Sequence, residues 1–177
     1  VSLASNGQIT FTPDADFNGT DTFTYVANTP EGGRAEATVT VEVTPVNDAP
    51  DARDNSGFVT DEDVPIQIVA SLLAVNDSDP DGEPLTLTSV SSSDTMDVTL
   101  TEDGVILATP RAYFYGQAYF DYTVEDAAGA SDTARVFVTV NPVNNAPEPV
   151  RDTVTTDEDV PFVIAASDLL GNDIDRD

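Results

Sequence analysis

The sequence repeats itself with a period close to the size of one domain, and this repetition limits what the chain can fold into. Asn47–Pro50 returns, with one change, as Asn144–Pro147 at an offset of 97 (144 − 47). Thr60–Pro65 returns as Thr156–Pro161 at an offset of 96 (156 − 60), which indicates a loop that is one residue shorter. The chain must therefore fold as a row of similar units and not around one large core.

Prolines mark the boundaries between these units. Pro45–Pro50 and Pro142–Pro147 each hold two prolines around a short polar stretch, which makes a stiff, extended connector. We therefore expect the C-terminal half of one repeat in residues 1–46, a complete repeat in 47–143, and the N-terminal part of a third in 144–177. The sequence begins in the middle of the pattern and shows no signal peptide, so we expect it to be a piece of a longer chain.

The complete repeat is expected to consist of short strands. The candidates are Phe58–Val59, Pro65–Val69, Leu85–Val90, Asp97–Leu100, Val105–Leu107, Tyr119–Val124 and Ala134–Val140. Val136, Val138 and Val140 alternate on one face, and Glu102–Gly104 predicts a hairpin turn. Only Ala70–Val75 suggests a helical turn. About seven short strands in one repeat predict an all-β fold of Ig-like sandwiches.

Acidic residues dominate the charge of the chain. It contains 33 acidic residues against 6 basic ones, for a formal net charge of -27, and all the basic residues are arginines. Such a chain repels nucleic acids and anionic membranes, so neither is an expected partner. Two explanations remain for the excess: carboxylates that bind divalent cations, or an acidic surface adapted to high salt. Clustering of the acids in motifs favours the first.

The missing residue types exclude several kinds of chemistry. Cysteine and histidine are absent, which excludes disulfides and argues against a zinc site. With lysine absent as well, the chain offers no His, Cys or Lys as a base or nucleophile. Paired carboxylates could hydrolyse glycosides, but the acids lie in motifs that the repeats share, so we do not expect an enzyme. No apolar stretch approaches the 18 or so residues that a membrane helix needs, so no membrane insertion is expected. An exported protein, extracellular or on a bacterial surface, fits this composition.

Two acidic motifs are candidate metal sites. Asp77, Asp79 and Asp81 occupy alternate positions before a turn glycine, which suits either the oxygen ligands of calcium or an ordinary Asx turn. Asp61–Asp63 and its copy Asp157–Asp159 each place three acids together, either around a cation or as a solvated strand edge that blocks aggregation.

Three motifs in order give the chain a family resemblance. Val46–Pro50, Asp61–Pro65 and Asn76–Gly82 resemble the cadherin-like tandem repeats of large bacterial surface adhesins, of the VCBS/RTX-adhesin type. The resemblance implies calcium bound at the junctions between consecutive repeats, so that adjacent repeats of the same chain are each other's partners.

The resemblance also implies which residues bind calcium. At the first junction, between residues 1–46 and 47–143, the implied ligands are Asp14, Asp16, Asn47, Asp48, Asp77, Asp79 and Asp126. At the second junction, between 47–143 and 144–177, they are Glu62, Asn144, Asp173 and Asp175. Asp81 and Glu158, from the acidic motifs, complete the set. Arg111, Tyr113 and Asn145 replace three carboxylates at the second junction, so we expect tighter calcium binding at the first.

The expected function is a calcium-stiffened spacer that carries an adhesive domain away from the cell. Two alternatives remain open. The repeat could bind carbohydrate or a partner surface through Tyr113 and Tyr115, although the chain has no tryptophan. It could also be a filament subunit in which partial repeats of successive copies complete one another head to tail by strand addition.

Overall fold

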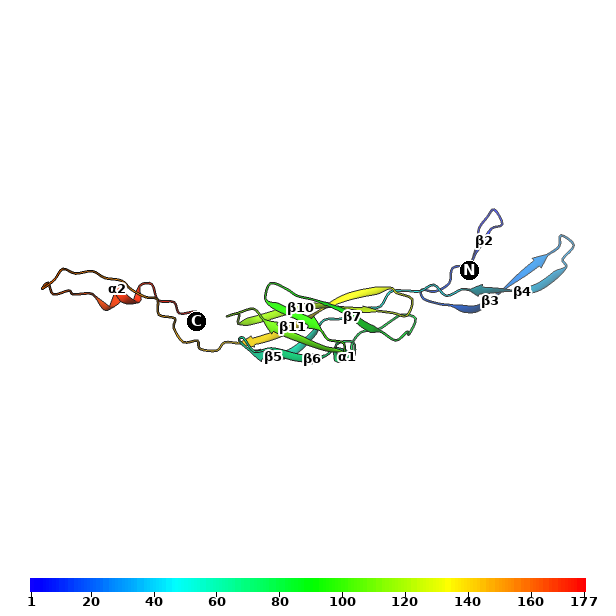
Figure 1. Ribbon diagram of the computed structural model, residues 1–177. Helices are drawn as coiled ribbons and strands as arrows, with labels where there is room; N and C mark the ends of the chain where they lie inside the picture. The colour runs from blue at the N-terminus through cyan, green and yellow to red at the C-terminus, as the bar shows by residue number, and fades with distance from the viewer.

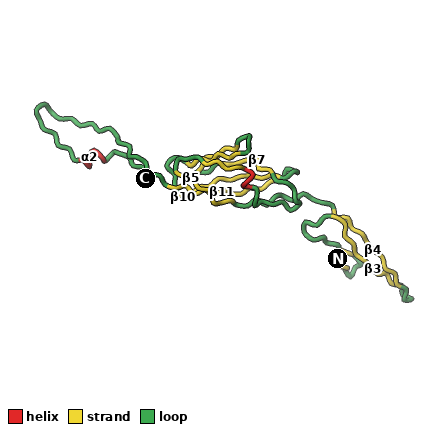
Figure 2. The backbone as a smooth tube through the Cα atoms, turned by 90° about the horizontal axis from the view of Figure 1, so that it is seen from below, coloured by secondary structure: helices red, strands yellow, loops and turns green.

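The computed structural model describes all 177 residues as an elongated row of three segments. The complete repeat, residues 47–143, forms the central body, residues 1–46 extend from one end of it, and residues 144–177 extend from the other (Figure 1). A view turned by 90° shows the same linear order (Figure 2). The C-terminus folds back to the boundary between the body and the last segment. No helix is long and apolar enough to cross a membrane.

The complete repeat is a sandwich of two sheets. The first contains, in spatial order, β5 (Asn55–Asp61), β11 (Ser131–Asn141), β10 (Gly116–Glu125) and β7 (Thr86–Ser91). The second contains β6 (Ile66–Val69), β9 (Val105–Pro110) and β8 (Met96–Leu100), and the short helix α1 (Ala70–Leu73) follows β6. β5 runs parallel to β11, and all other pairs are antiparallel. The predicted all-β, Ig-like fold is confirmed.

Alternation of side chains along the strands explains the core. On β10, Phe120, Tyr122 and Val124 are fully buried, whereas the residues between them are partly exposed. On β11, Val136 and Val138 are likewise fully buried, as predicted. The facing sheet adds buried side chains from β8 and β9. Each large side chain removed from water in this way stabilises the fold by about 1.5–3 kcal/mol.

The predicted hairpin joins β8 to β9. Gly104 closes the turn by donating its backbone N–H to the carbonyl of Thr101 at 3.0 Å. Its φ of 73° is a conformation that residues with a Cβ rarely adopt, which explains a glycine at this position.

Residues 1–46 repeat the second half of the sandwich without its partner strands. β1 (Ser2–Leu3) and β2 (Ile9–Thr10) form one pair, and β3 (Gly19–Asn28) and β4 (Arg34–Val43) form another. Adding 97 places β3 on β10, in the same register with the next strand. Because no second sheet covers it here, Tyr25 on β3 is 45% exposed, whereas its counterpart in the complete repeat is fully buried.

Residues 144–177 repeat the first part of the sandwich. Helix α2 (Ala166–Leu170) lies 96 residues after α1. The counterparts of β5 and β6 form no strands, because no counterparts of β9 and β11 are present in this segment to pair with them. The folded part is the base next to the body, where Glu148 and Ile174 form an antiparallel bridge.

Candidate functional site

The connector at the first junction is fastened to the complete repeat by acidic side chains. Asn47 donates its side-chain amide to Asp126 Oδ2 at 2.8 Å, and the backbone N–H of Asp48 donates to Asp81 Oδ2 at 2.8 Å. Asp81 lies in the loop between α1 and β7, and Asp126 directly follows β10. Residues distant in sequence thus meet at one end of the sandwich, which is where the family resemblance implies that they lie.

Asp126 is a buried carboxylate that remains charged. Its side chain belongs to a residue that is only 7% exposed, and Oδ1 accepts the backbone N–H groups of Ala128 and Ala130 at 2.9 and 2.8 Å. The hydrogen bond from Asn47 lowers the pKa of Asp126 most, and the loop N–H groups add to it against the opposing effect of burial. The protein therefore holds an anion at the end of the sandwich.

Asp79 carries a buried oxygen that the protein does not satisfy. Its Oδ1 accepts the backbone N–H of Asp81 at 2.8 Å and that of Glu83 at 3.4 Å. Its Oδ2 is shielded from solvent and has no hydrogen-bond partner. An unsatisfied carboxylate oxygen is costly, and a bound cation is the kind of group that removes the cost.

Four carboxylates from three parts of the chain line one hollow of about 280 Å³ at this junction. Asp14 and Asp16 come from the first segment, Asp48 from the connector, and Asp81 from the complete repeat. No arginine lines the hollow. In the structure as it stands, no group of three or more acidic side chains has the geometry to hold a metal ion. The donor types suit calcium, and closing such a site requires the carboxylates to move inward.

Asp77 lies apart from this hollow. Its carboxylate accepts the hydroxyl of Tyr122 at 2.9 Å and the backbone N–H of Arg53 at 2.7 Å. Burial, and next the hydrogen bond with Asp77, raise the pKa of the Tyr122 hydroxyl far above its usual value. Asp77 thus connects the loop to the core strand β10 and fixes the position of the acidic motif Asp77–Asp81 against the sandwich.

The second junction repeats two backbone hydrogen bonds of the first. The backbone N–H of Asn145 donates to Asp177 Oδ2 at 2.8 Å, as Asp48 does to Asp81. The backbone N–H of Val150 donates to Asp173 Oδ1 at 2.8 Å, as that of Arg53 does to Asp77 at 2.7 Å. The two connectors therefore have the same backbone frame.

Glu62 lies at the second junction and is 4% exposed. It accepts the backbone N–H of Val143 at 3.3 Å and the side-chain amide of Asn145 at 3.1 Å. Its two acidic neighbours also have partners: Asp61 accepts from Asn141 and Asp63 from the backbone of Tyr113. In this copy of the acidic triplet, all three side chains are thus hydrogen bonded to other segments.

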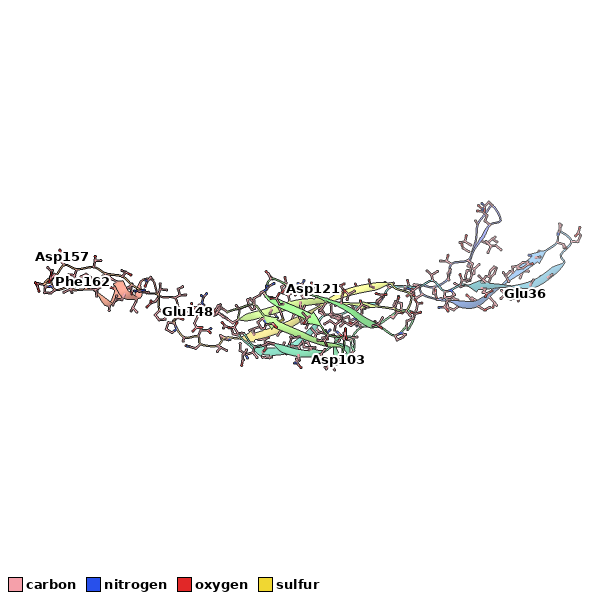
Figure 3. All side chains as sticks on the ribbon, in the orientation of Figure 1. Glu36, Asp103, Asp121, Glu148, Asp157 and Phe162 are labelled. Carbon is pink, nitrogen blue, oxygen red and sulfur yellow. The ribbon has the colours of Figure 1, made fainter.

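The remaining predicted ligands are more scattered. Asn144 hydrogen bonds only within its connector, and Asp175 accepts a backbone N–H from Asp177 at 3.4 Å. Glu158 is exposed, next to Asp157, at the far tip of the last segment (Figure 3). Arg111, where the first junction has Asp14, turns away to pair with Asp97 at 2.9 Å.

Sequence reasoning missed Asp177 and Arg176 at the second junction. Asp177 was detectable, because it lies 96 residues after Asp81; the structure shows the two carboxylates accepting equivalent backbone N–H groups, those of Asn145 and Asp48. Arg176 replaces Pro80 at that offset, and nothing in its local sequence indicates what it contacts.

A loose similarity links the chain to solved structures. It is 19% identical to the human mucin-like protocadherin EC1-2 fragment, with 80% of this chain and 78% of that chain covered and a TM-score of 0.42. It is 14% identical to protocadherin gamma B7 cadherin domains 1–4, with 90% of this chain and 43% of that chain covered and a TM-score of 0.46. It is 18% identical to the endo-fucoidan hydrolase MfFcnA4 of glycoside hydrolase family 107, covering 74% of this chain but only 20% of that chain, with a TM-score of 0.35. The chain thus spans about a fifth of that hydrolase's length.

The family comparison is more specific. No curated protein matches the chain. The family model described as a bacterial Ig domain matches residues 1–42 and again residues 47–139, on either side of the first connector. This supports the expected Ig-like repeat, while the narrower resemblance to VCBS/RTX adhesins stays a prediction. Since the two matches cover most of its length, the chain belongs to the bacterial Ig domain family.

Proposed function

We propose that the chain is part of an extracellular spacer in which calcium fixes the angle between successive β-sandwiches of a bacterial surface protein, such as an adhesin. The proposal rests on the hollow lined by Asp14, Asp16, Asp48 and Asp81. It is supported by the unsatisfied side-chain oxygen of Asp79, which lies two residues before Asp81 in the sequence. Domains of this family are commonly extracellular and typically not enzymes.

Repulsion between carboxylates explains how calcium would control the first junction. Carboxylates that face one another across a junction repel, and with 33 acidic residues against 6 basic ones the chain has few cations of its own to offset this. Calcium takes six to eight oxygen ligands in a flexible geometry and so can draw both sides of the first junction together. Without calcium, the same repulsion opens the junction and makes it a hinge. The second junction, with fewer carboxylates, is proposed to bind calcium more weakly.

The alternative of carbohydrate binding has less support. Sugar sites need an open aromatic face, and the Tyr113 ring is covered on one side by Arg176, with the guanidinium carbon 4.5 Å from the ring centre. Head-to-tail assembly of copies remains a prediction that size measurement in solution can check.

Calcium is expected to raise the melting temperature of the chain by about 5–20 °C at about 10 mM. Extracellular modules bind calcium with dissociation constants of about 10⁻⁴–10⁻³ M, which gives about 1.4–2.7 kcal/mol for one site by mass action, and about 4–8 °C per kcal/mol for a domain of this size. The shift in melting temperature is measured by scanning calorimetry in CaCl₂, in MgCl₂ and in NaCl of equal ionic strength. Equal shifts in all three salts would mean that screening of an acidic surface, and not a calcium site, stabilises the protein.

A further inference from the structure

The second junction contains a contact that the first lacks. Arg176, in the last segment, lies over the ring of Tyr113, which belongs to the complete repeat, with 4.5 Å between the guanidinium carbon and the ring centre. The same guanidinium pairs with Glu148, its Nη2 at 3.1 Å from Oε2 and its Nε at 3.3 Å from Oε1. Figure 3 shows Glu148 between the body and the last segment.

The geometry suits a rigid contact. Glu148 receives the guanidinium through both of its oxygens, which fixes the plane of the group and not only its charge. A cation over the face of an aromatic ring is attracted by the ring's electrons. Arg176 lowers the pKa of Glu148, which keeps that carboxylate charged. Glu148 therefore aims Arg176 at a ring on the neighbouring repeat.

A second cross-junction bridge lies beside it. The side-chain amide of Asn145 is 3.1 Å from Glu62 Oε1 in the complete repeat and 3.3 Å from Asp177 Oδ1 in the last segment. The two N–H groups of this amide are shared between the two carboxylates and the carbonyl of Val143, at 3.1 Å, so the amide bridges acids on the two sides of the junction without a metal. The first junction has Asp48 in this place, which can only accept.

All parts of the contact are replaced together at the first junction. At the offsets of the repeat, Tyr113 corresponds to Asp16, Arg176 to Pro80 and Glu148 to Asp51. Asp51 pairs instead with Arg53, two residues along its own segment, at 2.7 Å. The two junctions thus share two backbone hydrogen bonds, but the first lacks the tyrosine, arginine, glutamate and asparagine that hold the second one without a cation.

We propose that the second junction is held by a metal-independent clamp, in which Arg176, aimed by Glu148, docks on Tyr113 and Asn145 bridges the flanking carboxylates. The chain then contains two kinds of junction: one that loosens when calcium is withdrawn and one that stays fixed. This contrast rests on the proposed function of the first junction, whereas the clamp itself does not.

Spin labels test the clamp, because the chain has no cysteine and two introduced cysteines are labelled alone. Thr99→Cys with Thr153→Cys spans the second junction, Thr24→Cys with Thr99→Cys spans the first, and all three threonines are exposed. In EDTA, the pulsed-EPR distance distribution across the second junction is expected to be narrow. Arg176→Ala or Tyr113→Ala is expected to abolish the narrow component, and Tyr113→Phe, which keeps the ring, to retain it.

Arg151→Ala is the matched control, since it removes an exposed arginine of the same segment that forms no ion pair. It is expected to leave the distribution unchanged. The clamp is overturned if, in EDTA, the distance distribution across the second junction is as broad in the unmutated protein as in the Arg176→Ala variant. It is also overturned if Arg151→Ala broadens that distribution as much as Arg176→Ala does. If the distance distribution across the first junction does not narrow when calcium is added, the proposed function is overturned, and the proposal of a clamp at the second junction is unaffected.

Discussion

Replacing Asp79 by asparagine is expected to remove most of the stabilisation by calcium while leaving the protein at least as stable in EDTA. The two side chains have nearly the same shape, and the asparagine Oδ1 can keep the backbone hydrogen bonds from residues 81 and 83. The change removes the charge of the one buried side-chain oxygen that has no partner. A neutral amide costs less to bury without a partner than a carboxylate, so the metal-free protein should not lose stability.

The measurement is the difference in melting temperature between about 10 mM CaCl₂ and EDTA for each variant, where one site is worth about 1.4–2.7 kcal/mol. Asp103→Asn is the matched control, because it removes one exposed acid from the β8–β9 turn, within the body and away from both junctions (Figure 3). It should keep the full calcium shift. If both variants lose the shift equally, net charge and not a site at Asp79 explains the effect.

Phe120→Ala is expected to produce the largest loss of stability, about 3–5 kcal/mol. Phe120 is fully buried between the two sheets, and its removal leaves a cavity that well-packed neighbours cannot fill. Denaturant unfolding followed by circular dichroism measures the change as a lower midpoint with an unchanged slope.

The repeat supplies its own control for this experiment. Phe23 lies 97 residues earlier, at the same place on β3, but no second sheet covers it and it is only partly buried. Phe23→Ala should therefore cost much less than Phe120→Ala in the main transition. Equal losses would mean that residues 1–46 share one core with the body, contrary to the linear arrangement in Figure 1.

Much of the fold could be predicted from the sequence because it depends on local patterns. Local patterns predicted the strand that became β10 and the buried face of β11, and Glu102–Gly104 predicted the hairpin. The limits of strands were less accurate. β10 begins at Gly116, three residues before the predicted start at Tyr119, because Gly116, Gln117 and Ala118 continue to pair with β11.

The candidate site was predictable only as far as the acidic motifs and the family resemblance reached. The motif pointed to Asp81 and the resemblance to Asp48, which the structure places in one hollow with Asp14 and Asp16. Neither could reveal that Asp77 is held by the hydroxyl of a buried tyrosine, because that contact depends on how the loop packs against β10.

The contact between Tyr113 and Arg176 could not be predicted from the sequence. Tyr113 and Arg176 are 63 residues apart (176 − 113), and only the fold brings them into contact. In sequence, the replacement of Asp16 by Tyr113 is only the loss of a carboxylate, whereas the structure shows that the new side chain has a partner of its own. A repeat that departs from the pattern at several positions at once therefore indicates a different contact and not only a weaker site.

The most direct test of calcium at the first junction is an anomalous difference map from crystals of this chain grown in about 10 mM CaCl₂, a concentration well above the expected dissociation constant. We expect a peak in the hollow between Asp14, Asp16, Asp48 and Asp81, with carboxylate oxygens from both repeats about 2.3–2.6 Å from it. A map without a peak there, with these side chains turned separately into solvent, would contradict the proposed calcium site.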